Sequence, residues 1–336
     1  MLGIDIGSKS IKVIELTGTA GSWQLKSSGA VGYAGVSPDK ATVDSDFTAI
    51  AEVLKKIIAQ IGISSKDVNL AIPEALAFTR VIKFPMLSDE EVASAVKWEA
   101  EQYIPIPVNE AVVQYVILER NQSLSSVSVL LVAAPKNVVE KYVKIAKLAG
   151  LIPVSAETEL TALARSLAAE KGTSMILDLG SSATDMSIVK DGNTVFTRSI
   201  PVAGEAFTRA VAQSFGIEPV QAEEYKKTYG LSSTQLEGKV RAALEPIFRV
   251  IIDEIKKAIH FYQTDEKGDA PTSIIITGGA SVMPEIVPFL AENLDIETVI
   301  GNPFAKLTLE PETAKALIPY TSIYGTAVGL AMREDL

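Results

Sequence analysis

The chain contains no cysteine, and His260 is the only histidine among its 336 residues. The absence of cysteine excludes disulfides, thiolate metal ligands and a cysteine nucleophile. No run reaches the roughly 18 consecutive apolar residues of a membrane-spanning helix, and the most apolar stretch, residues 127–134, is typical of a buried strand. The first residues predict a strand at once, with neither the basic flank nor the cleavage site of a secretory signal peptide. We therefore expect a cytoplasmic protein.

Basic residues are outnumbered by acidic ones, 31 against 41, which gives a net charge of −10. This balance disfavours a nucleic-acid partner, because a protein that tracks phosphates needs clustered lysine and arginine. Apolar residues make up 47% of the chain, enough for substantial cores in two lobes of ordinary domain size. Stretches typical of strands and of helices alternate, so the sequence predicts an α/β protein.

One short pattern occurs twice, at residues 3–10 (Gly-Ile-Asp-Ile-Gly-Ser-Lys-Ser) and at residues 177–184 (Leu-Asp-Leu-Gly-Ser-Ser-Ala-Thr). Each copy predicts a strand, a tight turn and a returning strand. The glycine lets a ligand approach bare backbone, and the small residues after it turn N–H groups toward an anion such as phosphate. A single turn of this kind more often joins two strands without any ligand. Asp5 and Asp178 stand about half the chain apart, however, which predicts two related halves, each with a phosphate-facing hairpin and a carboxylate.

A third segment points to a nucleotide. Residues 273–276 form a short apolar run that ends in Thr-Gly-Gly-Ala-Ser at residues 277–281, before a helical pattern resumes at Met283. Two adjacent glycines after a buried strand let a planar base or a ribose lie against the backbone. In this order the three segments resemble the nucleotide signature of the superfamily of actin, sugar kinases and chaperone ATPases. The resemblance implies an actin-like duplicated ATPase fold, with two lobes around a nucleotide cleft.

Residues 84–107 narrow the resemblance to a family. Ser88 and Glu91 predict a capping box that begins a helix, and Pro105 and Pro107 end it. Apolar residues at helical spacing predict its buried face: Val92, Val96, Ala100 and Tyr103. The segment resembles the PilM family, actin-like ATPases of type IV pilus assembly, and implies an insertion subdomain of the type found in the cell-division protein FtsA. The resemblance continues over three further segments, residues 177–191, 200–205 and 222–230.

The resemblance also implies a domain organisation. The first lobe is expected at residues 1–176, with the insertion subdomain at about 68–155. The second lobe is expected at residues 177–319, with a helical subdomain at about 217–272. Residues 320–336 are expected to form a C-terminal helix that returns to the first lobe.

The resemblance implies a site for ATP or ADP with Mg²⁺. Asp5 and Asp178 would hold the metal ion through water. Lys12 would place a charge near the phosphates, although an exposed strand lysine explains it equally well. Glu223 would take the ribose hydroxyls and Lys226 would flank the base, although without the family their spacing is that of a surface ion pair. The full set of nucleotide-binding candidates is Asp5, Gly7, Ser8, Lys9, Ser10, Lys12, Asp178, Gly180, Ser181, Ser182, Thr184, Gly204, Glu223, Lys226, Gly278, Gly279, Ala280 and Met283.

No catalytic base can be identified. His260 lies in a helical stretch predicted at residues 236–262, far in sequence from every phosphate motif. We therefore expect slow or negligible turnover, at most a weak Mg-dependent ATPase, with ATP acting mainly as a conformational ligand. Trp98 lies off the predicted buried face of its helix, so it is either covered by another element or available to a partner.

The family implies a scaffold of the type IV pilus machinery. Its expected partner is the cytoplasmic N-terminal tail of the inner-membrane protein PilN, held in a groove of the first lobe, with Trp98 as a candidate contact. The assembly ATPase is a further candidate partner. The chain ends at residues 333–336 without a basic amphipathic segment, so we expect it to reach the inner membrane through a protein. Two alternatives remain: an FtsA-like filament-forming protein, and a small-molecule kinase, which would need a polar substrate pocket and an aspartate base.

Overall fold

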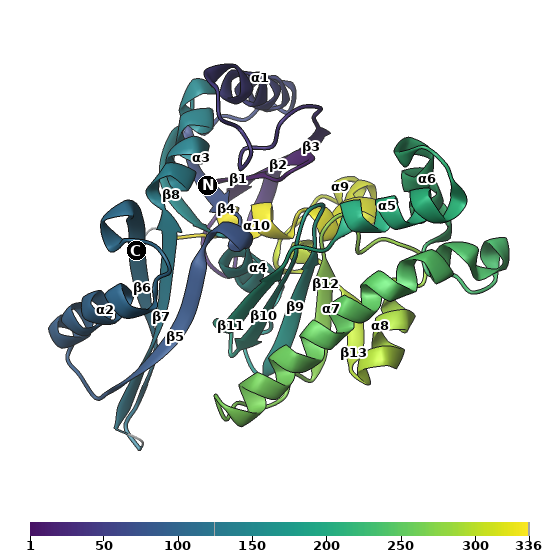
Figure 1. The fold of residues 1–336 in the computed structure, drawn as a ribbon. Helices are drawn as coiled ribbons and strands as arrows, with labels where there is room; N and C mark the ends of the chain where they lie inside the picture. Colours follow the sequence, from purple (N-terminus) through teal and green to yellow (C-terminus); the bar gives the residue numbers. More distant parts are fainter. Residues whose placement is uncertain (124, 335–336) are drawn as a thin grey trace. The chain divides into compact units, whose positions relative to one another are not determined.

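A computed structural model describes residues 1–123 and 125–334 (Figure 1). The chain divides into two compact units. The first unit comprises residues 1–162, residues 193–197 and the chain from Thr326 on, and the second comprises residues 163–192 and 198–325. The division falls inside helix α4 (Glu159–Leu167), earlier than the expected boundary at residue 176. Beyond that division, the Ser166 hydroxyl donates to the Gly325 carbonyl oxygen of the same second unit at 2.8 Å.

The main sheet of the first unit has the order β3-β2-β1-β4-β8. Its strands are β1 (Leu2–Ile6), β2 (Ser10–Thr17), β3 (Gln24–Gly32), β4 (Asp67–Ile72) and β8 (Ile152–Thr158). The first three are antiparallel neighbours, whereas β4 runs parallel to β1 and β8 parallel to β4. All five residues of β1 are buried because elements cover both faces of the sheet.

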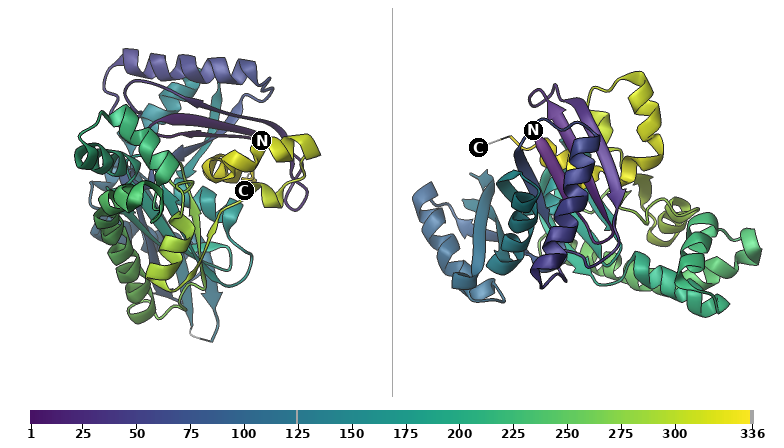
Figure 2. Two further views of the ribbon diagram at one scale, coloured as in Figure 1. Left: turned by 90° about the vertical axis from the view of Figure 1, so that its right-hand side faces the viewer. Right: turned by 90° about the horizontal axis from the view of Figure 1, so that it is seen from above.

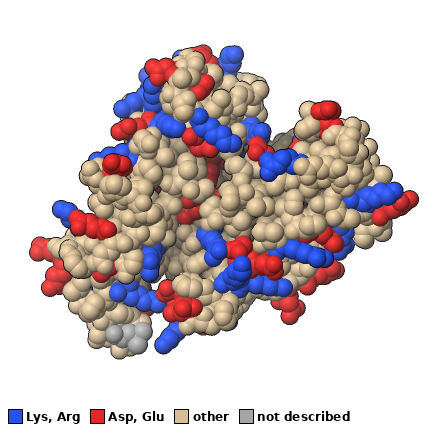
Figure 3. All heavy atoms as spheres, in the orientation of Figure 1, with Lys and Arg blue, Asp and Glu red and all other residues tan. Residues whose placement is uncertain are grey.

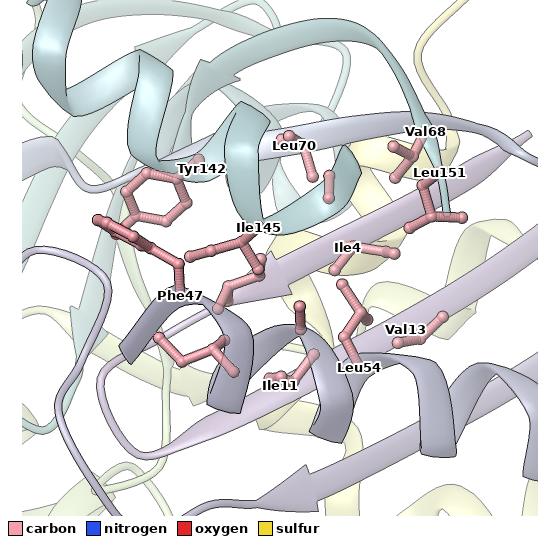
Figure 4. Packing of buried hydrophobic residues seen from close by; sticks show 14 of the residues in the cluster. Ile4, Ile11, Val13, Phe47, Leu54, Val68, Leu70, Tyr142, Ile145 and Leu151 are labelled. Atoms are coloured by element: carbon pink, nitrogen blue, oxygen red, sulfur yellow. The ribbon is translucent and has the colours of Figure 1, made fainter. Parts of the chain in front are cut away.

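Two helices, α1 (Asp44–Gln60) and α3 (Lys136–Leu148), form the core on one face of this sheet (Figures 2 and 4). Ile4, Leu54 and Ile145 meet there, from β1, α1 and α3 (Figure 4). Helix α10 (Gly325–Ala331) packs directly on β1. The approach is so close that a Cβ at Gly3 would lie 2.3 Å from the Ala327 carbonyl oxygen.

The insertion is narrower than the expected range 68–155. It consists of a sheet of order β5-β7-β6 and helix α2 (Asp89–Tyr103). The strands are β5 (Phe78–Pro85), β6 (Ala111–Asn121) and β7 (Ser126–Pro135). Strand β6 is not among the predicted elements. By contrast, β4, α3 and β8 belong to the main sheet and its core.

Helix α2 agrees with most of its prediction. The capping box is confirmed, since the Ser88 and Glu91 side chains each bond to the other residue's backbone N–H. Val92, Val96 and Ala100 are buried against β7. Tyr103 was wrongly placed on the buried face: it is 38% exposed, and the Arg80 guanidinium lies 4.0 Å from its ring centroid.

The second unit repeats the strand order of the first. Its sheet, β11-β10-β9-β12-β13, again sets an antiparallel hairpin beside parallel strands, although residues 193–197 of β11 are assigned to the first unit. The strands are β9 (Thr173–Leu179), β10 (Thr184–Lys190), β11 (Asn193–Ile200), β12 (Ser273–Thr277) and β13 (Glu297–Ile300). The helices are α5 (Gly204–Phe215), α6 (Pro219–Tyr229), α7 (Lys239–Thr264), α8 (Ile286–Leu294) and α9 (Pro311–Leu317). The shared order supports the predicted relation between the two halves.

Helix α7 begins later than residue 236, where the sequence predicted it. Leu236, Glu237 and Gly238 have φ values of 48°, 54° and 70°, and a right-handed helix cannot pass through left-handed residues. No helix in the described parts of the chain is both long and apolar enough to cross a bilayer. On the face shown in Figure 3, basic and acidic side chains are interspersed.

Glu74 is a buried carboxyl group of the first unit. It begins the 3₁₀ turn Glu74–Leu76 after β4 and is 4% exposed. Burial raises the pKa of this carboxyl, and the hydroxyls of Thr197, Thr79 and Thr158 offset only part of the rise. The folded chain therefore keeps a proton that the unfolded chain releases, so stability falls as the pH rises from the ordinary pKa of 4.5 to the raised one.

We expect Glu74→Gln to stabilise the chain increasingly as the pH rises, because the amide keeps the shape of the protonated carboxyl and does not titrate. The gain in free energy of unfolding should be small at about pH 4.5 and larger at neutral pH, measured by urea denaturation at both. Glu101→Gln, an exposed change on α2, is the control. An equal gain at both pH values would contradict the proposed cause.

Candidate nucleotide site

The first hairpin joins β1 to β2 and carries a buried ion pair. Asp5 stands opposite Lys12 in the strand register, and the Lys12 ammonium donates to Asp5 Oδ2 at 2.9 Å. The Lys12 side chain is 15% exposed, so the alternative of an exposed strand lysine is wrong. The Gly7 N–H donates to the Ser10 carbonyl oxygen at 3.1 Å and closes the turn. The Tyr33 hydroxyl donates to the Gly7 carbonyl oxygen at 2.7 Å, a support that no sequence pattern indicated.

The second carboxylate oxygen of Asp5 accepts no hydrogen bond from the described residues. Oδ1 is buried, and no hydrogen-bond donor in the described residues reaches it. An unsatisfied buried polar atom costs about 1–3 kcal/mol, and more when it is charged. A hydrated Mg²⁺ would supply donors to this oxygen through its bound water, so the residues present fit the expected ion.

The second hairpin joins β9 to β10 and repeats the turn. The Gly180 N–H donates to the Ala183 carbonyl oxygen at 3.1 Å, as Gly7 does in the first hairpin. Here the register sets Asp178 opposite Asp185, where the first hairpin has a lysine. Like charges directly opposite each other in a sheet repel, and a cation beside them would relieve the repulsion. Sequence reasoning missed Asp185, although its position matches that of Lys12.

The hydroxyl of Thr184 has a structural partner. Thr184 is fully buried, and its Oγ1 donates to the Val202 carbonyl oxygen at 2.7 Å. The phosphate contact expected of this residue therefore stays a prediction for its backbone and not for its side chain.

Gly204 is the first residue of α5 and rests on the second hairpin. Its N–H donates to the Gly180 carbonyl oxygen at 3.1 Å, and the Glu205 N–H donates to the Ser181 carbonyl oxygen at 2.9 Å. The next two N–H groups of the helix both donate to the Ala203 carbonyl oxygen. The N–H groups of residues 204–207 are thus all hydrogen-bonded within the chain. Gly204 supports the hairpin and has no N–H left for a phosphate.

Glu223 and Lys226 of α6 lie behind Gly204. Lys226 is 5% exposed, so these residues are not a surface ion pair. The ammonium donates to Glu223 Oε2 at 2.6 Å, and the Thr208 hydroxyl also bonds to that oxygen. Burial raises the pKa of the Glu223 carboxyl, but the bonds from Lys226 and Thr208 outweigh it, and the net pKa is lowered. Glu223 is therefore ionised at neutral pH.

Gly278 and Gly279 follow β12, and they differ in whether the surrounding structure requires a glycine. Gly278 has a φ of 88°, and a Cβ there would lie 2.3 Å from Asp178 Oδ1, so both its backbone and its surroundings require glycine. At Gly279 a Cβ would meet no atom within 4 Å, and φ is outside the left-handed range. Every other described glycine with such open surroundings has a positive φ. Nothing in the described chain requires glycine at 279, which is the expected condition where a ligand lies against the backbone.

Within each unit the structure brings the predicted residues together in one place. In the second unit, direct contacts link Asp178, Gly180, Gly204, Lys226 and Gly278. Ala280 and Met283, which follow the glycine pair in the chain, are buried. His260 is exposed on α7. The described residues contain no cluster of three or more acidic or histidine side chains suited to a metal ion.

Comparison with known sequences gives one family and several relatives. A sequence profile described as type IV pilus assembly protein PilM matches residues 3–335. The cell division protein FtsA of Neisseria meningitidis serogroup B is 28% identical over 154 residues, which covers 38% of this chain and 36% of that protein. FtsA of Pseudomonas aeruginosa is 26% identical over 176 residues, covering 47% and 41%. The matches therefore span less than half the length of these curated relatives.

Solved structures resemble the whole chain. A PilM–PilN type IV pilus biogenesis complex has a TM-score of 0.84 at 24% identity and covers 99% of this chain and 97% of that one. EutJ of Carboxydothermus hydrogenoformans has a TM-score of 0.59 at 15% identity, covering 98% and 88%. MreB5 of Spiroplasma citri bound to ADP has a TM-score of 0.55 at 17% identity, covering 98% and 94%. The expected actin-like α/β fold is confirmed.

The adjacent glycines give a matched pair of variants. Gly278→Ala should lower the free energy of unfolding by about 1–3 kcal/mol or more, because of its left-handed backbone and the clash with Asp178. Gly279→Ala should leave stability unchanged and weaken Mg-ATP binding about tenfold, since the new methyl group occupies space that a ligand needs. Denaturation and calorimetric titration measure the two effects. Unchanged Mg-ATP affinity in Gly279→Ala would place the nucleotide elsewhere.

Proposed function

The chain belongs to the family of type IV pilus assembly proteins PilM, and we propose that it is an ATP-binding scaffold of that machinery. Gly279 is the observation that supports nucleotide binding most directly, because nothing in the described chain requires glycine there. The two hairpins of equal construction add to it, since each presents a glycine turn beside a carboxylate.

In this proposal the hairpins hold the phosphates and α6 holds the ribose. The turns at Gly7 and Gly180 present backbone to the phosphates, and Lys12 adds a positive charge. Bound Mg²⁺ would neutralise phosphate charge, with Asp5 and Asp178 as its carboxylate partners, through water. We assign no catalytic base and expect slow or negligible hydrolysis. ATP then acts through the difference in its affinity for two conformations of the chain.

The proposed partner is the N-terminal cytoplasmic tail of a PilN-like membrane protein. Support comes from the similarity to a solved PilM–PilN complex. Trp98 is the candidate contact: of the two alternatives for this residue, exposure is observed, with 68% of it accessible. Large exposed aromatic side chains are frequent anchors of protein interfaces. Such a partner would hold the chain at the cytoplasmic face of the inner membrane, and other pilus components, including the assembly ATPase, remain further candidates.

One prediction of this proposal concerns the partner. A labelled peptide of the PilN tail from the same genome should bind saturably in fluorescence anisotropy, with an affinity that changes when Mg-ATP is added. Trp98→Ala should weaken it about tenfold, because an interface aromatic often contributes more than 1 kcal/mol, whereas Trp98→Phe should weaken it less.

Tyr320→Ala is the control for this experiment, since Tyr320 is an exposed aromatic residue of the second unit. Failure of the peptide to bind in either state, with Mg-ATP binding intact, would count against the scaffold. Sedimentation of the ATP-bound chain as polymers would then favour an FtsA-like filament.

Another prediction of this proposal concerns the metal ion. Asp178→Asn should weaken binding of Mg-ATP about tenfold and change the affinity for ATP in EDTA much less, because the lost charge acts on the cation. Asp269→Asn is the control, an exposed change in the same unit. Equal losses with and without magnesium would exclude a role of Asp178 toward the ion.

A further inference from the structure

A lysine ammonium lies buried in the second unit. Lys226 is 5% exposed, although lysine is among the residue types least often buried. An ammonium group removed from water without partners is strongly unfavourable, so its surroundings must supply acceptors.

The acceptors account for every donor of this ammonium. Nζ donates to Glu223 Oε2 at 2.6 Å, to Thr208 Oγ1 at 3.0 Å and to the Gly204 carbonyl oxygen at 3.2 Å. A lysine ammonium has three N–H groups. None is left for a base, a ribose or a phosphate, so the place beside the base that the family resemblance implied for Lys226 does not agree with its contacts.

These acceptors come from two helices. Glu223 lies one turn before Lys226 on α6, whereas Gly204 and Thr208 are the first and fifth residues of α5. Gly204 in turn donates its N–H to the Gly180 carbonyl oxygen, and a Cβ at Gly204 would lie 3.1 Å from that same oxygen. Contacts therefore run without a break from the carboxylate on α6 to the turn of the second hairpin.

Glu223 keeps one oxygen for a ligand. Its Oε2 is taken by Lys226 and Thr208, while among the described residues Oε1 has only the ammonium of Lys227 at 3.6 Å, beyond hydrogen-bond distance. The Glu223 side chain is 35% exposed, and that of Lys227 57% exposed. A carboxylate oxygen accepts only, so it suits a hydroxyl donor such as a ribose diol.

Resting on the proposed nucleotide function, we infer that Lys226 is a positioning residue that does not touch the nucleotide. It fixes the Glu223 carboxylate for the ribose hydroxyls and holds the start of α5 against the Gly180 turn. Loss of its charge therefore disturbs recognition of the ribose and of the phosphates together, whereas loss of the Glu223 charge disturbs the ribose alone.

The test compares three ligands on the full chain by calorimetry: Mg-ATP, Mg-2′,3′-dideoxy-ATP and AMP. The ratio of ATP to dideoxy-ATP affinity reports the ribose hydroxyls, and the ratio of ATP to AMP affinity reports the outer phosphates. Glu223→Gln should lower the first ratio about tenfold and leave the second unchanged. Lys226→Met should lower both ratios about tenfold.

Two further variants control for folding. Lys226→Met leaves Glu223 without its partner, which destabilises the pair, so the double variant Glu223→Gln/Lys226→Met removes both charges. Its ATP to AMP ratio should remain as low as that of Lys226→Met. Glu224→Gln is the neighbouring control, since the Glu224 side chain is 68% exposed.

A lysine that contacts the base would give a different result. Lys226→Met would then lower the affinity for all three ligands by one factor and leave both ratios unchanged, which overturns the inference. Unchanged ratios in the folded double variant would overturn it as well. A wild-type chain that binds none of the three ligands would instead refute the proposed nucleotide function, and the inference with it.

Discussion

Both halves of the protein depend on one constraint. A buried strand carries a carboxylate next to its end, and the chain must turn within the next few residues. Each half meets it with a glycine whose N–H donates to the carbonyl oxygen three residues ahead, at 3.1 Å in both hairpins. In both hairpins a backbone hydrogen bond therefore closes the turn. The strands that lead into the turns, β1 and β9, each have a hydrogen-bonded neighbouring strand on both edges. Asp5 and Asp178 are therefore fixed at equivalent points of two sheets.

The two hairpins differ in how they balance that carboxylate. In the first, Lys12 neutralises Asp5, and the pair is nearly closed to solvent. In the second, a further carboxylate, that of Asp185, takes the position of the lysine. The strand register thus sets two carboxylates opposite each other in one half and a carboxylate opposite an ammonium in the other. In the nucleotide site that we propose, a divalent cation beside Asp178 and Asp185 would offset this pairing of like charges.

The sequence predicted most of what local patterns encode. The hairpins, the capping box of α2 and the glycine pair after β12 all depend on residues close together in the chain, and each has a recognisable composition. Contacts between distant segments were missed, such as the support of Gly7 by Tyr33 and the burial of Lys226 against α5. An i, i+3 pair of opposite charges reads the same whether it lies on a surface or beneath another helix. Only the packing of α6 on α5 decides between the two.

These contacts also suggest where a nucleotide can change the protein. In the second unit the ammonium of Lys226 has used all its donors within one continuous network, so this part is a fixed platform. In the first unit the Lys12 ammonium donates to Asp5 Oδ2, and a phosphate placed nearby would compete for that ammonium. Transfer of Lys12 to the phosphate would leave Oδ2 of Asp5, in addition to Oδ1, for the hydrated cation that accompanies ATP. Because this exchange needs both phosphate and metal, we expect the response to Mg-ATP to arise in the first hairpin, in the same unit that carries Trp98.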